Sequence, residues 1–257
     1  MRYFFHIAYL GTNYSGWQKH SGTTTVQQVL EDKLKQVLKT PIFINGCGRT
    51  DAGVHASQFF FHADLNVIDL DELLFRLNKA LPADIAVFDI IQVKGNQHAR
   101  FDAYLRTYNY QIHTYKNPFL SSTSSFYQLK NLNLKQIDKA LQLLLVYQDY
   151  RAFCTTPAKY EHTICKISSV SLIVDDDEKH ISIQVSANRF LSKMIRIIIG
   201  KLLKIGTGKM SVDEFEHHLI SKETPAILDL AYPQGLHLSK VTYPFLDLPN
   251  QGFLVKG

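Results

Sequence analysis

Two hydrophobic periods alternate along the chain, and this alternation limits the fold more than any other feature. Residues 2–10 alternate apolar and polar side chains as a strand does, and residues 26–38 place their apolar side chains on one helical face. Thr25 and Gln28 have the spacing of a helix-capping box. The first half continues in the order strand, helix, strand, strand, helix, strand. This order is typical of an α+β domain.

The second half repeats this order loosely. Residues 106–115 alternate as a strand, and an acidic turn at residues 175–177 joins two further strand patterns as a hairpin. Residues 190–205 have a helical pattern that Gly206 should close. The other expected elements are helices at residues 133–146, capped by Asn133, and at residues 211–220, capped by Ser211, and a last strand at residues 235–243.

We therefore predict an α+β fold of two similar halves, residues 1–105 and residues 106–257. Their mostly antiparallel sheets should join, with an active-site cleft between the halves. No linker composition separates the two halves, and 46% of the 257 residues are hydrophobic, so a sizeable core is available.

Composition and missing motifs exclude several classes of protein. The net charge of +5 permits an anionic partner such as a nucleic acid without demanding one. Lysines and arginines interrupt the most apolar helical run, residues 190–206, so we expect no membrane span. Three cysteines without a C-x-x-C spacing fit a reducing cytoplasm. Phosphate-binding glycine loops and zinc-ligand spacings are missing from the sequence, so we expect neither a cofactor nor a metal.

The stretch GCGRTDAGVHASQFFFH, residues 46–62, carries the main candidate for chemistry. Residues 42–44 before it and residues 59–61 at its end are both predicted to be strands. Between them, glycines surround Arg49 and Asp51. Such a connection is either a solvated polar turn or a loop that holds a carboxylate at a site.

Arg196 is the second candidate, because it stands among isoleucines in the pattern MIRIII. Either it points out of an amphipathic helix, or its guanidinium is buried and needs a carboxylate partner. On the second interpretation, Asp51 on its glycine-rich loop is the best candidate for that partner.

These residues belong to a longer resemblance. GRTDAGVHA resembles the active-site motif of the tRNA pseudouridine synthase A family. YLGTNYSGWQ, VQQVLE, LPADIAV, HARFDA, RTYNY, NRFLSKMIRIIIG and GLHL resemble further segments of that family. They occur in the same order and extend from residue 9 to residue 238, which is most of the chain.

The resemblance implies a pseudouridine synthase fold and a role for each site residue. Asp51 corresponds to the catalytic aspartate and Arg196 to the arginine that pairs with it. Tyr108 corresponds to the tyrosine that stacks on the target base, although the sequence alone would equally allow a core strand tyrosine there, as for Tyr110. The other two counterparts are Leu236, an apolar residue beneath the base, and Arg49, which approaches the RNA.

The resemblance also implies a cytoplasmic isomerase that converts uridine to pseudouridine in the anticodon stem-loop of tRNA, at positions 38–40, without a cofactor. A homodimer is expected. One segment departs from the family: where many relatives carry arginines, residues 158–167 read AKYEHTICKI. RNA contacts in this segment are therefore open.

Two other functions remain compatible with the residues. The chain could be an RNA-binding paralogue of the same fold without useful turnover. It could also be a hydrolase that uses Asp51 with a second carboxylate, for which Asp64 and Asp69 are the nearby candidates.

Overall fold

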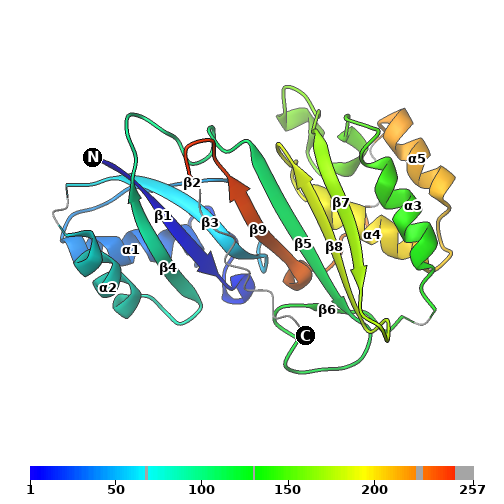
Figure 1. The fold of residues 1–257 in the computed structure, drawn as a ribbon, viewed down its shortest axis with the longest axis horizontal. Helices are drawn as coiled ribbons and strands as arrows, with labels where there is room; N and C mark the ends of the chain where they lie inside the picture. Colours follow the sequence, from blue (N-terminus) through cyan, green and yellow to red (C-terminus); the bar gives the residue numbers. More distant parts are fainter. Residues whose placement is uncertain (67–68, 130, 224–227, 247–257) are drawn as a thin grey trace. The chain divides into compact units, whose positions relative to one another are not determined.

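β1 (Arg2–Tyr9) is the central strand of the N-terminal sheet in the computed structural model, which describes residues 1–66, 69–129, 131–223 and 228–246. It pairs antiparallel with β3 (His55–Asp64) on one side and with β4 (Ile85–Gln92) on the other. β2 (Asn45–Gly46) pairs with the end of β3, and β9 (Leu236–Thr242) runs parallel to its beginning. The strand order is therefore β4-β1-β3-β9 (Figure 1).

Two helices accompany this sheet. α1 (Val26–Leu38) packs on α2 (Leu70–Ala80), which lies against β4. The predicted Thr25 cap is confirmed, since its side chain accepts a hydrogen bond from the Gln28 amide. A row of phenylalanines from β3, Phe59 to Phe61, is almost fully buried and forms the centre of the core.

The second unit has the strand order β5-β8-β7, built from β5 (Leu105–His113), β8 (His180–Ala187) and β7 (Ile167–Val174). β6 (Ser125–Phe126) pairs with the end of β5. The hairpin of β7 and β8 around the acidic turn is confirmed, because Val174 faces Ile181 across it.

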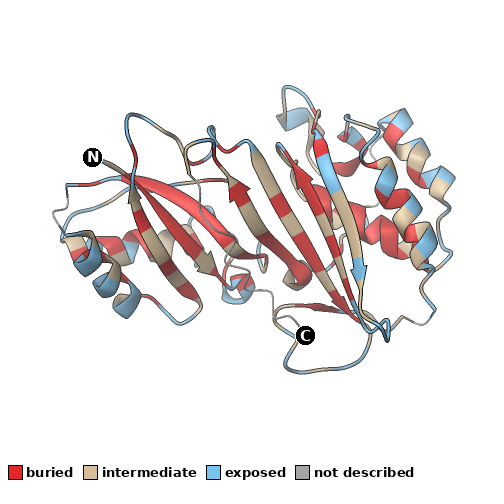
Figure 2. Cartoon of the chain, viewed as in Figure 1, coloured by how far each residue is buried: buried red, intermediate tan, exposed pale blue. Residues whose placement is uncertain are grey.

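The α-helices of this unit, in its described residues, are α3 (Leu134–Leu143), α4 (Met194–Gly206) and α5 (Val212–Ser221). α3 contacts α4, α5 and β7, and almost every residue of α4 is buried (Figure 2). Asn133 caps α3 as expected. Ser211 caps α5 as expected, and the structure adds a full capping box with Glu214.

The α+β class predicted from the sequence is confirmed. The compact units are Met1–Arg106 together with the described residues from His237 onward, and Thr107–Leu236. From His237 onward, the last strand groups with the N-terminal residues, and its His237 and Leu238 pair with β3.

Two local predictions are wrong for identifiable reasons. Residues 42–44 are not a strand, because side chains of α1 satisfy the backbone of Ile44: its N–H donates to Glu31 and its carbonyl accepts from Gln27. Gly206 does not close α4 from outside but is its last residue. A Cβ there would lie 2.6 Å from Ile137, and Gly208 instead takes the left-handed conformation, with φ of 72°.

Candidate active site

The loop between β2 and β3 carries Asp51 in a closed turn. The Val54 amide donates to the Asp51 carbonyl over 3.1 Å, and Gly53 within the turn has φ of 76°. A side chain at residue 53 would be strained in that conformation, so the glycine is required for the turn. Gly53 and the bond from Val54 therefore set the direction of the backbone that follows Asp51.

A second segment, residues 9–17, holds this loop from outside. The Trp17 amide donates to the Thr50 carbonyl over 3.1 Å, and the Gly53 amide donates to the Tyr14 carbonyl over 3.3 Å. A Cβ on Gly16 would lie only 2.5 Å from the Thr50 oxygen. The two backbones therefore touch, and this contact is possible only because residue 16 has no side chain.

Aromatic packing supports the loop from below. The Trp17 ring lies with its centroid 4.0 Å from that of Phe59, and Gly46 leaves room for the indole, since a Cβ there would be 2.6 Å from it. The Tyr9 hydroxyl also bonds the Thr50 hydroxyl at 2.9 Å. The carboxylate of Asp51 thus stands on a loop that is attached to a rigid core.

The side chains along the loop differ in exposure. Asp51 is half-buried and Arg49 is exposed, whereas Cys47 is fully buried. Burial raises the pKa of the Cys47 thiol to about 11, so it is not a nucleophile at neutral pH. Among the acidic and thiol groups of residues 46–55, Asp51 is the one that can act on a substrate.

The structure separates the two tyrosines that the sequence could not tell apart. Tyr110 on β5 is fully buried, and its hydroxyl lies 2.9 Å from both the Ser125 hydroxyl and the Tyr232 carbonyl. Burial raises the pKa of Tyr110 well above its usual value. Tyr108 is half-buried, and the ring of Phe190 meets it edge to face with centroids 5.1 Å apart. Tyr110 is structural, and Tyr108 is the one with an accessible ring.

Arg196 is half-buried on α4 and has a defined orientation. Its Nε donates to the Ala231 carbonyl over 2.8 Å, while its own carbonyl accepts from the Ala231 amide over 3.0 Å. One edge of the guanidinium is thereby tied to the backbone. This contact favours the interpretation in which the Arg196 guanidinium is partly buried.

Leu236 is 6% exposed and follows the short helix η4 (Pro233–Gly235). A Cβ on Gly235 would lie 2.6 Å from the Gln111 carbonyl, so this glycine lets the chain approach β5 closely. The same Cβ would lie 3.0 Å from the Tyr110 ring, so the residue before Leu236 lies against β5 at Tyr110. Leu236, Tyr108 and Arg196 belong to one compact unit, and Asp51 and Arg49 to the other. The pairing of Asp51 with Arg196 stays a prediction.

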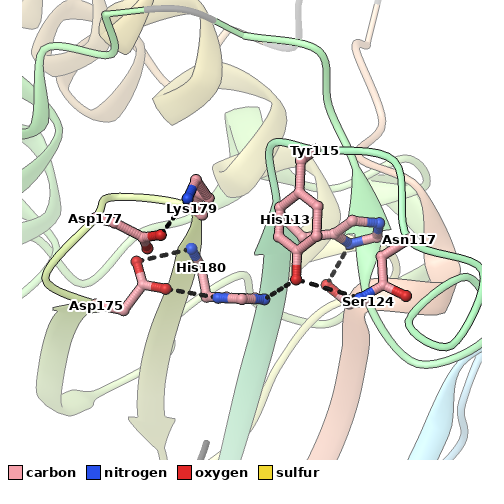
Figure 3. A network of polar contacts seen from close by, with 8 residues as sticks. All are labelled: His113, Tyr115, Asn117, Ser124, Asp175, Asp177, Lys179 and His180. Atoms are coloured by element: carbon pink, nitrogen blue, oxygen red, sulfur yellow. Dashed lines mark hydrogen bonds and ion pairs between the residues drawn. The ribbon is translucent and has the colours of Figure 1, made fainter.

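The acidic hairpin tip is a possible cation site, because Asp175, Asp177 and His180 bring donor atoms within 4.8 Å of one another. Each donor already has a partner (Figure 3): Asp177 pairs with Lys179, and the Asp175 carboxylate lies 2.6 Å from His180 Nδ1. The His180 ring continues to the Tyr115 hydroxyl at 3.2 Å. A lysine ammonium inside the cluster competes with any cation, and we assign the network to the hairpin turn.

Sequence reasoning missed the residues that hold the Asp51 loop. Tyr14, Gly16 and Trp17 contact it through backbone and ring, yet nothing in their spacing relates them to residue 51. The two glycines in YLGTNYSGWQ could have indicated that the backbone there approaches another segment closely, but they do not show which segment that is.

A family model described as tRNA pseudouridine synthase matches residues 6–102 and 140–244. The chain belongs to the tRNA pseudouridine synthase family. The matched segments of this synthase contain Arg49, Asp51, Arg196 and Leu236, whereas Tyr108 falls between them. The assignment of Tyr108 therefore depends on the RTYNY motif and on its accessible ring.

Curated relatives extend the match over almost the whole synthase. The tRNA pseudouridine synthase A of Porphyromonas gingivalis is 35% identical over 246 residues, covering 95% of this chain and 97% of the relative. That of Bacteroides fragilis is 37% identical, with 95% and 96% covered. That of Gloeobacter violaceus is 35% identical, with 93% and 79% covered. The expected family and isomerase class are thus confirmed.

In the part of the chain that the structure describes, no helix of this synthase is both long enough and apolar enough to cross a membrane.

Proposed function

We propose that this enzyme isomerises uridine to pseudouridine at positions 38–40 in the anticodon stem-loop of tRNA. The C1′–N1 bond breaks, the base turns, and C1′ bonds to C5. The C5 hydrogen leaves to solvent as a proton, and N1 gains one. Atoms and electrons balance without an oxidant, a reductant or a cofactor.

The observation that carries the proposal is the fixed, half-buried carboxylate of Asp51. Its loop is held by backbone hydrogen bonds from Trp17 and to Tyr14, so the carboxylate enters the reaction with little freedom to lose. It can attack C1′ or C6, or remove the C2′ proton. Each of these steps needs an ionised carboxylate.

The other site residues have supporting roles in the proposal. Arg196 pairs with Asp51 and stabilises its charge, which burial alone would disfavour. Tyr108 offers an accessible ring on which a flipped base can stack, and Leu236 supplies an apolar contact for it. Arg49, exposed on the catalytic loop, contacts the RNA backbone.

The structure argues against the hydrolase alternative, because both candidates for its second carboxylate already have structural partners. Asp64 forms a two-bond ion pair with Arg2, with both N···O distances 2.8 Å, and this contact lowers the pKa of Asp64. Asp69 accepts a hydrogen bond from the Glu72 amide and caps α2. Both carboxylates have structural partners in the same unit as Asp51.

The test uses tRNA transcripts that carry tritium at C5 of uridine, incubated with the enzyme and no additive. Pseudouridine formation releases the tritium into water, and sequencing of the product locates the modified position. Asp51→Asn should abolish release while the fold and tRNA binding are kept. Asp32→Asn changes the charge equally at an exposed position on α1 and should remain active.

Each competing function predicts a different result. A wild-type enzyme that binds tRNA but releases no tritium is the RNA-binding paralogue. Free uracil without pseudouridine indicates the hydrolase. Appreciable tritium release by Asp51→Asn would refute the role of this residue.

We also propose that the enzyme is a cytoplasmic homodimer, as the family resemblance implies. A tRNA is large beside one subunit of 29.4 kDa, so two subunits offer a larger surface for its phosphates. Sedimentation of the free enzyme at micromolar concentration tests this, and a monomer mass would contradict it.

A further inference from the structure

A short segment that runs into the stretch departing from the family pattern forms a strap over the start of α4. Residues 155–160, called the strap below, follow the buried residues Phe153 and Cys154. The short helix η3 (Pro157–Lys159) turns the chain so that Tyr160 comes next, half-buried. Further along, the Tyr150 amide bonds the Thr163 carbonyl at 3.0 Å. The strap is therefore anchored on both sides.

Three hydrogen bonds connect the strap to one residue, Ser192. The Ser192 amide donates to the Tyr160 hydroxyl over 3.0 Å, and the Thr155 hydroxyl donates to the Ser192 hydroxyl over 3.2 Å. The Thr155 amide reaches the Ser192 carbonyl at 3.5 Å. The strap thus binds the backbone on both sides of this serine, one turn before Arg196.

The start of α4 needs such outside support. The residue before the helix, Lys193, has φ of 60°, a conformation that is sterically costly for any residue except glycine. No side chain caps α4, whereas a side chain caps each of the other α-helices in the described residues. The bonds to Ser192 hold the chain in the turn that Lys193 requires.

This turn carries two side chains of the site. Phe190 lies two residues before Ser192, and its ring meets Tyr108 edge to face. Arg196 lies four residues after Ser192, in the first turn of α4. A shift at Ser192 therefore moves the support of Tyr108 and the origin of Arg196 together.

We infer that Tyr160 is a positioning residue of the synthase: through the Ser192 amide it fixes the start of α4, and with it Phe190 and Arg196. The inference rests on the proposed function. The Tyr160 ring also lies under Arg189, whose guanidinium carbon is 5.6 Å from the ring centroid. This cation–π contact stabilises the ring in the position from which its hydroxyl reaches Ser192.

The test compares Tyr160→Phe, Tyr160→Leu and a matched control, Tyr147→Phe. Tyr160→Phe removes only the acceptor for the Ser192 amide, and Tyr160→Leu also removes the ring under Arg189. Tyr147 is a partly buried tyrosine of the same unit whose hydroxyl donates to Glu216 on α5 over 2.7 Å, so its change removes a comparable bond elsewhere.

Two readouts separate positioning from general stability. In Tyr160→Phe, amide hydrogen exchange at Ser192 should accelerate about fivefold, as expected for one lost hydrogen bond. The kcat for tritium release should fall about three- to tenfold with KM changed less than about twofold, because geometry and not tRNA contact is altered. Tyr160→Leu should lose at least as much kcat, and Tyr147→Phe should match the wild type in both readouts.

If amide hydrogen exchange at Ser192 is unchanged in Tyr160→Phe, the Tyr160 hydroxyl does not hold the Ser192 amide and the inference is wrong. Faster exchange with unchanged kcat would overturn the positioning role, as would an equal loss of kcat in Tyr147→Phe. A wild-type enzyme without tritium release would refute the proposed function instead. The exchange rate at Ser192 would still test whether Tyr160 holds the start of α4.

Discussion

Gly16→Ala tests the contact that holds the Asp51 loop, and the chain offers a matched control in Gly22→Ala. Both glycines have a left-handed backbone, with φ of 87° and 81°. An alanine Cβ at residue 16 would lie 2.5 Å from the Thr50 carbonyl oxygen and 3.1 Å from the Asp51 carbonyl carbon, whereas a Cβ at residue 22 would meet nothing within 4 Å. Both changes place an alanine in the left-handed conformation, but only the alanine at residue 16 collides with the Thr50 carbonyl oxygen.

The expected magnitudes follow from that difference. The left-handed conformation costs an alanine about 1 kcal/mol at either position. To reach an ordinary contact of 3.4 Å, the Thr50 oxygen must move about 0.9 Å from the 2.5 Å position, and the Trp17–Thr50 hydrogen bond weakens. The lost bond costs about 1 kcal/mol and the steric shift about 1 kcal/mol more. We expect about 3 kcal/mol for Gly16→Ala against about 1 kcal/mol for Gly22→Ala.

Urea unfolding measures the stability difference, and tritium release measures its effect on the site. A displacement approaching 1 Å beside Asp51 should lower kcat up to about 100-fold in Gly16→Ala, at a temperature where both variants are folded. Gly22→Ala should keep kcat close to the wild type. If the two variants have equal stability and equal kcat, the loop does not depend on this contact and the reasoning is wrong.

Burial lowers the pKa of Lys201 on α4 from 10.5 to about 8, so the unfolded chain holds this proton more tightly and stability rises with pH between those values. Lys201→Met should therefore raise the free energy of unfolding by about 1–2 kcal/mol at pH 7, and this gain should shrink toward pH 10.5. Urea unfolding midpoints at several pH values measure the gain, with the exposed Lys209→Met as the control. A gain that does not change with pH would contradict the prediction. The proposed ion pair predicts that Asp51→Asn and Arg196→Met are non-additive by at least about 1 kcal/mol in a thermal-melt cycle, and simple addition of the two effects would refute the pair.

Local sequence rules determined the helices and their boundaries where the interactions are short-range. Thr25, Asn133 and Ser211 each bond an amide three residues further along, and these bonds require no information from the rest of the chain. The hairpin at residues 175–177 and the buried row on β3 follow equally from turn residues and hydrophobic pattern. The ordered motifs also determined the family, because they extend over most of the chain.

The tertiary structure decided the elements whose backbone partners are distant in sequence. Residues 42–44 have a strand-like composition, yet side chains of α1 take the place of a neighbouring strand. Gly206 was expected to follow the last residue of α4, but it is itself that last residue and packs closely against Ile137 of α3. In both cases a non-local contact outweighs a local preference, and no pattern within one segment reports it.

The candidate site shows the same division. The sequence by itself selected Asp51 and Arg196, because a charged residue among glycines and another among isoleucines are locally conspicuous. The residue pattern alone left Tyr108 and Tyr110 open and the family resemblance selected Tyr108, whereas the tertiary structure shows the physical difference: Tyr110 is fully buried and Tyr108 is half-buried against Phe190. The tertiary structure alone revealed that residues 14–17 hold the Asp51 loop and that Tyr160 holds Ser192. Backbone hydrogen bonds are available to every residue type, so the sequence leaves no mark of which distant segments they join.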